Sequence, residues 1–215
     1  MSKSRKVDLS TYKESLEPVV RQRYDEKIKE IDDIDPWPYS VPSSIWERHA
    51  EVKWPQVTDV DIYDYLVTRT SSYTYQQMKA YKSLEAYNYF ISGFVLDMGL
   101  MRLDHTSIET ANNNNRVVVL GSVKHSQRMS DSPLRPWVAI REYGRIMFAH
   151  CTCMAGQGEV CSHVAALLFA IQANSKLQAK TVTEEKCYWL PAAAKNVRSI
   201  FYDIRGEMNF ILKIF

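Results

Sequence analysis

The sequence of 215 residues lacks the features that mark secreted and membrane-spanning proteins. It has only 4 Cys, too few for the dense disulfide framework of a small secreted domain. Its first ten residues hold no apolar run of the kind found in a signal peptide. No apolar stretch approaches the roughly 20 residues that span a bilayer. We therefore expect a soluble intracellular protein with no membrane partner, and a nuclear location stays open because residues 2–6 are weakly basic.

The sequence also lacks a strong net charge. The value of +2 gives no overall field that would draw the protein onto DNA. The charge is uneven, since residues 1–101 are net −3, residues 102–145 net +3 and residues 146–215 net +2. This mild basicity is compatible with nucleic-acid contact and equally with an ordinary solvated surface.

The chain does have enough apolar residues for a core, at 46% hydrophobic and 12% aromatic. Apolar residues recur at helical spacing over 16–32, 59–68 and 75–92. The Pro-rich stretch 33–58 predicts loops, with a short helix at 45–51. Three tryptophans in this stretch are expected to pack onto the domain, although an exposed recognition surface is the alternative; they are Trp37, Trp46 and Trp54.

After Gly93, which is placed to end a helix, the pattern changes to strands. β-Branched residues predict strands at 94–96 and 117–123. A hairpin over 137–151 turns at Tyr143 and Gly144, and a helix follows over 161–173. The predicted class is α+β, with N-terminal helices and a short antiparallel sheet.

We divide the chain into four parts by these changes of pattern. The first is an N-terminal helix with a Pro-rich linker and the second is helical. The third holds the cysteine cluster and the fourth is a C-terminal extension, which we expect to be truncated. Their bounds are residues 1–58, 59–114, 115–175 and 176–215.

Three of the four cysteines and one of the five histidines cluster within thirteen residues, at Cys151, Cys153, Cys161 and His163. Side chains two apart on a strand point to the same face, so the first pair can turn toward one ion. Two glycines in the connecting segment allow a sharp turn, and the second pair arrives at the predicted helix start. The cluster predicts one tetrahedral Zn²⁺ site.

The predicted site is structural rather than catalytic. The protein supplies all four ligands, whereas a catalytic zinc keeps one position for water. The alternative is a group of buried free cysteines beside a core histidine. His150 should face the other side of the strand from Cys151, and we interpret it as an ordinary surface or core histidine.

The spacing Cys-x-Cys, a short spacer and Cys-x-His resembles the SWIM-type zinc finger. That resemblance implies a ββα unit within about residues 115–175. Residues 150–169, 81–88, 123–127 and 187–191 are also similar to a group of uncharacterised animal SWIM proteins. In longer members of that group a phage-type recombinase exonuclease domain often follows, and such proteins are associated with mobile DNA elements. No acidic cluster of a nuclease core follows the finger here.

The resemblance to SWIM modules implies binding of nucleic acid or of protein, and a fold alone cannot decide between these. We hypothesise a zinc-binding module whose partner is DNA or another protein of a mobile-element system. The alternatives are the non-catalytic N-terminal part of a recombinase-type exonuclease and a pure protein-interaction scaffold. Candidate phosphate contacts, each also readable as an ordinary surface charge, are Lys124, Arg128, Arg135, Arg141 and Arg145.

We expect no enzymatic activity. The sequence has no Gly-rich phosphate loop and no nucleophile motif. The acidic group at residues 32–35 is explained by the end of a helix next to Pro36. We therefore predict no catalytic residues and no small-molecule substrate.

Overall fold

A computed structural model describes residues 12–37, 46–47, 52–69, 79–103, 115–125, 131–154 and 159–178, with the side chains of 79–84 left out. These residues form four α-helices and a four-stranded antiparallel sheet. The expectation of a mixed helix-and-sheet protein is confirmed.

The sheet is a meander with the strand order β1-β2-β3-β4. Its strands are β1 (Val95–Leu103), β2 (Arg116–Val123), β3 (Trp137–Arg141) and β4 (Ile146–His150). The β-branched run of β2 forms a strand as predicted. The prediction for β1 was too short, because residues 97–102 include Asp, Gly, Met and Arg. Pairing with β2 from Val95 to Leu103 overrides their weak strand propensity.

The hairpin β3–β4 turns where the sequence predicts. Gly144 has φ +107, a conformation that side-chain-bearing residues rarely adopt. A Cβ atom there would also lie 2.8 Å from the carbonyl carbon of Gln56. The amide of Gln56 in turn donates a hydrogen bond to the carbonyl of Glu142, 3.1 Å away. The turn is therefore fastened to the chain that precedes α2.

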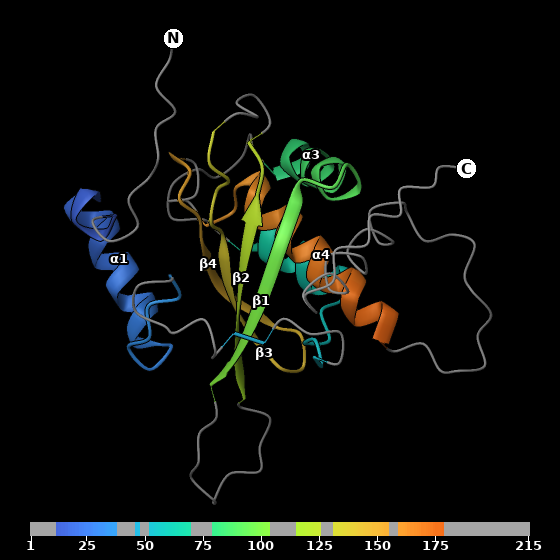
Figure 1. Ribbon diagram of the computed structural model, residues 1–215, viewed down its shortest axis with the longest axis horizontal. Coiled ribbons are helices and arrows are strands. Elements are labelled where there is room, and N and C mark those ends of the chain that lie inside the picture. Colours follow the sequence, from blue (N-terminus) through green and yellow to red (C-terminus); the bar gives the residue numbers. More distant parts are fainter. Residues whose placement is uncertain are drawn as a thin grey trace, which may run out of the picture.

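One face of the sheet is covered by α3 (Lys79–Ile91) and α4 (Ser162–Gln178), which lie together on that side in Figure 1. Gly121 of β2 lets α4 approach closely, since a Cβ there would lie 2.7 Å from a methyl carbon of Leu167. The short helix α2 (Asp59–Tyr63) continues as a π-helical turn, η3 (Asp64–Thr68). Thr58 caps α2 in a capping box with Asp61.

The opposite face is covered by α1 (Pro18–Lys29), which stands alone on that side of the sheet in Figure 1. Its inner side packs with Trp37 against Trp137 and Phe148. Trp37, Trp46 and Trp54 are all buried, as predicted. The short helix expected at 45–51 is wrong at Glu47, which forms a β-bridge with Leu100. The remaining residues of that predicted helix, apart from Trp46, lie outside the described part.

Among the described helices, none is long and apolar enough to span a bilayer.

Candidate metal centre

The four predicted ligands come from two ends of secondary structure. Cys151 directly follows β4, and Cys153 lies two residues further along. Cys161 directly precedes α4, and His163 is the second residue of that helix. The alternation of the strand sends Cys151 into the core between the sheet and α4. His150 points to the α1 side, as predicted, where its ring packs near Trp37 and Trp137.

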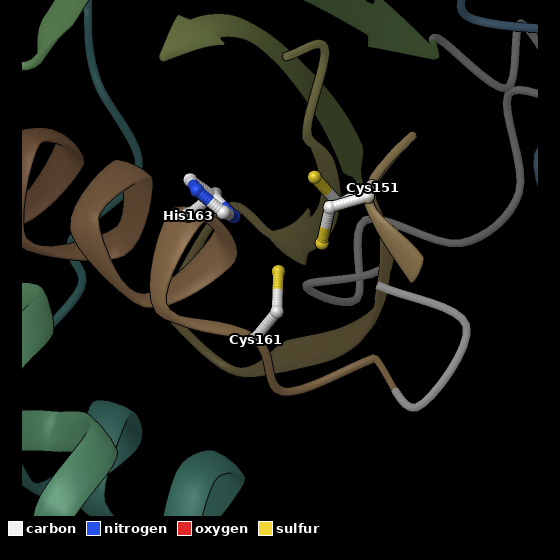
Figure 2. Close-up of side chains that lie close together, drawn as sticks. Cys151, Cys161 and His163 are labelled. Carbon is white, nitrogen blue, oxygen red and sulfur yellow. The ribbon is translucent and has the colours of Figure 1, made fainter. Parts of the chain in front are cut away.

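The ligand atoms of Cys151, Cys153, Cys161 and His163 all lie within 4.8 Å of one another. Around a tetrahedral zinc such atoms would be roughly 3.5–3.8 Å apart, given the usual Zn–S and Zn–N distances. Figure 2 shows the side chains of Cys151, Cys161 and His163 directed toward a common point. The cluster therefore needs a contraction of about 1 Å at most to bind one ion.

Cys161 occupies the N-terminal end of α4. The backbone amide of Val164 donates a hydrogen bond to its Sγ at 3.4 Å. The amide of Ala165 donates to its carbonyl at 3.0 Å. The positive end of the helix dipole favours the thiolate over the thiol. This helix end thus offers Cys161 in the form that binds metal.

The thiols perturb one another. Burial raises the pKa of Cys151 well above its usual value, and its hydrogen bonds with Cys153 and Cys161 act in the same direction. Burial also acts to raise the pKa of Cys161. Hydrogen bonds from the other two cysteines and from His163 outweigh it, and the pKa of Cys161 falls well below its usual value. Cys161 is thus the cysteine that favours negative charge in this dry setting, where a cation is the natural counter-charge.

The imidazole of His163 hydrogen-bonds to Cys161, but one of its ring nitrogens has no partner among the described residues. This atom, Nδ1, is buried. A buried polar atom without a partner costs about 1–3 kcal/mol. Its ring is framed by Tyr89 and His125, with centroids 6.0 and 6.4 Å away. Coordination of a metal through Nδ1 would supply the partner that the described residues do not give this atom.

The donor set matches a soft or borderline metal ion. Three sulfurs and one nitrogen suit Zn²⁺, whereas Mg²⁺ and Ca²⁺ take oxygen ligands. In the described ranges this is the only group of three or more His, Cys, Asp or Glu side chains that could hold a metal. Cys151 and Cys161 are buried while Cys153 and His163 are half-buried. One edge of the site therefore lies near the surface.

The basic residues proposed as phosphate contacts do not form one group. Lys124 and Arg135 flank the bridge between Val123 and Leu134 at the metal end of the sheet. The amide of Arg135 donates to Oγ1 of Thr152, between the first two ligands, at 3.1 Å. Arg141 and Arg145 lie at the opposite end, in the hairpin turn region. Arg128 lies outside the described residues.

Sequence reasoning missed a set of charged residues at the metal loop, the segment between Cys153 and Cys161. Arg23 and Lys27 of α1 both form ion pairs with Glu159, which lies two residues before Cys161. The only sequence signal is the position of Lys27 within the apolar stripe of Val20, Tyr24 and Ile28.

Comparison with protein-family models, with curated proteins and with solved structures finds no match to this chain.

Proposed function

We propose that this chain is a structural zinc module. One Zn²⁺, held by Cys151, Cys153, Cys161 and His163, would fasten the hairpin β3–β4 to α4. The convergence of all four ligand atoms within 4.8 Å carries this proposal. The order hairpin, ligand loop and helix also matches the ββα unit implied by the resemblance to SWIM-type fingers. We extend the proposal to that finger type on the motif and this order of elements.

The zinc supplies folding energy rather than reactivity in this proposal. Four protein ligands leave no position for an activated water. In zinc-finger peptides such a site is worth on the order of 10 kcal/mol of apparent binding free energy. Chelation of the native protein should therefore raise amide hydrogen exchange across residues 150–173 while β1 and β2 stay protected. Unchanged exchange in residues 150–173 after the metal is removed would contradict a structural role.

We propose nucleic acid as the partner of this module. Lys124 and Arg135 flank the bridge between Val123 and Leu134 at the end of the sheet that carries the metal centre, where the half-buried ligands bring the site close to the surface. Residues 102–145 and 146–215 are both net positive, whereas residues 1–101 are net negative. The association with mobile DNA elements rests on the sequence resemblance.

The partner is tested with zinc-loaded full-length protein and fluorescent DNA and RNA oligonucleotides at two salt concentrations. Affinity should fall steeply with salt, because binding releases counterions from the phosphates. The double variant Lys124→Ala/Arg135→Ala should reduce the salt slope by about 2, at roughly 0.9 per phosphate contact. The matched variant Arg141→Ala/Arg145→Ala, at the far end of the sheet, should leave the slope unchanged.

Two results would overturn nucleic-acid binding at this end of the sheet. One is an equal loss of affinity in both double variants. The other is the absence of binding to every oligonucleotide while a protein partner stays bound at both salt concentrations, which would favour the scaffold hypothesis.

A further inference from the structure

α1, on the face of the sheet opposite α4, contacts residues that flank the metal ligands. Lys27 of this helix is 1% exposed. Its Nζ lies 3.0 Å from the carbonyl oxygen of Ala149, 3.2 Å from Nδ1 of His150 and 3.2 Å from Oε1 of Glu159. All three partners lie within two residues of a cysteine ligand. Burying a lysine ammonium is costly unless it is paired. The three hydrogen-bonding partners are therefore what allow Lys27 to occupy this buried position.

A hydrogen-bond chain leads from Lys27 to the first ligand. Because the ammonium can only donate, Nδ1 of His150 must accept and its Nε2 must carry the proton. Nε2 then donates to the hydroxyl oxygen of Tyr12, 3.0 Å away. That hydroxyl donates to the carbonyl oxygen of Cys151 at 3.4 Å.

The second half of the metal loop is held at Glu159. This residue has φ +65, which costs a non-glycine residue about 1–2 kcal/mol. Its carboxylate accepts from Nε of Arg23 at 2.9 Å, in addition to its pairing with Lys27. Its carbonyl accepts from the hydroxyl of Tyr65, in η3, at 3.1 Å. Side chains from both faces of the sheet therefore fix the backbone that leads into Cys161.

We propose that Lys27 is a positioning residue for the metal centre, so that docking of α1 and retention of the metal are coupled. Lys27 touches no ligand side chain. It orients the backbone on both sides of the ligand loop, through Ala149 and His150 before it and through Glu159 after it. Residues that hydrogen-bond to the ligand side chains typically contribute 10- to 100-fold to metal affinity, and Lys27, which acts one step further out through the backbone, should contribute about 10-fold. The inference rests on the proposed zinc site.

The first test compares Lys27→Met with Lys29→Met in the zinc-loaded full-length chain. Lys29 is an exposed residue of the same helix, so the matched substitution controls for the loss of charge. Zinc transfer to a chromophoric chelator should be about 10-fold faster from Lys27→Met, the lower end of the range for residues that bond the ligands directly. Glu159→Gln should accelerate transfer in the same direction. In Co²⁺-loaded protein the sulfur-to-cobalt and d–d bands should shift in Lys27→Met and stay unchanged in Lys29→Met.

The outcomes separate the two proposals. If the wild-type chain binds no zinc, the zinc module itself is wrong. If it binds zinc, and Lys27→Met and Lys29→Met release zinc at the same rate with the same Co²⁺ spectrum, only the coupling is wrong. If Lys27→Met does not fold, Glu159→Gln and hydrogen exchange of the wild type decide. Chelation should lower the protection of amides in α1, and unchanged protection there would overturn the coupling.

Discussion

The turn of the hairpin packs tightly enough against Gln56 to allow a quantitative test. Gly144→Ala places a methyl group on a residue with φ +107. The new Cβ would meet the backbone of Gln56, with the carbonyl carbon 2.8 Å away, and the Asp61 carboxylate at 3.2 Å. Backbone atoms cannot move aside as the end of a flexible side chain can. Gln56 is also held by its hydrogen bond to Glu142.

The expected loss in the free energy of unfolding has two parts. The same substitution at a second glycine separates them. The unfavourable φ costs about 1–3 kcal/mol, and the forced overlap adds about 1–3 kcal/mol. Gly93 also has a positive φ, of +70, but a Cβ there would meet nothing within 4 Å. Gly93→Ala should therefore lose only about 1–2 kcal/mol. The difference between the two variants, about 2 kcal/mol, measures the contact of the turn with Gln56.

Urea unfolding of the zinc-loaded chain measures this difference. With a slope of about 1–3 kcal/mol per molar urea, the midpoint of Gly144→Ala should lie roughly 1 M below that of Gly93→Ala. The folded fraction of Gly144→Ala should keep its zinc, because the turn lies at the end of the hairpin away from Cys151. Equal midpoints for the two variants would refute the close approach of this turn to Gln56.

Three further predictions concern the metal loop and its surroundings. His163→Ala should lose the metal, whereas His150→Ala should keep it, since only the first offers its ring to the cluster; equal metal loss, measured by elemental analysis, would show that the ligand assignment is wrong. Burial lowers the pKa of Lys27 to about 8, with Glu159 opposing only in part, from an ordinary value of 10.5. The native state then holds this proton less tightly than the unfolded chain. The stability of the wild type relative to Lys27→Met should therefore rise between pH 8 and about 10.5, by up to about 3 kcal/mol, and a flat difference in urea titrations across this range would contradict the burial of the ammonium. The zinc-loaded chain should cut no DNA with Mg²⁺ or Mn²⁺, and metal-dependent cleavage abolished by replacing one acidic residue would overturn the binding-module proposal.

The metal cluster and its immediate supports could be predicted because they are local in sequence. The spacing of Cys151, Cys153, Cys161 and His163 fixes which side chains can share an ion. Alternation along a strand places His150 on the opposite face from Cys151. The hairpin turn and the helix after Cys161 follow from glycine placement and apolar periodicity, and both are confirmed by the structure.

The contacts that tie distant segments together could not be predicted from one sequence. The full length of β1 depends on pairing with β2, because residues such as Asp97 and Gly99 do not favour strands on their own. Glu47 joins the edge of β1 through one bridge, where local spacing favours a helix. The ion pairs of Arg23 and Lys27 with Glu159 connect residues more than 130 positions apart, beyond any periodic pattern.

We propose that the four clustered side chains hold one zinc ion. Elemental analysis of full-length protein, purified without added metal or chelator, measures whether they do. We predict one zinc per folded chain, retained in His150→Ala and lost in Cys153→Ala and His163→Ala. A folded wild-type chain that contains no zinc and takes up none when it is offered would contradict the claim.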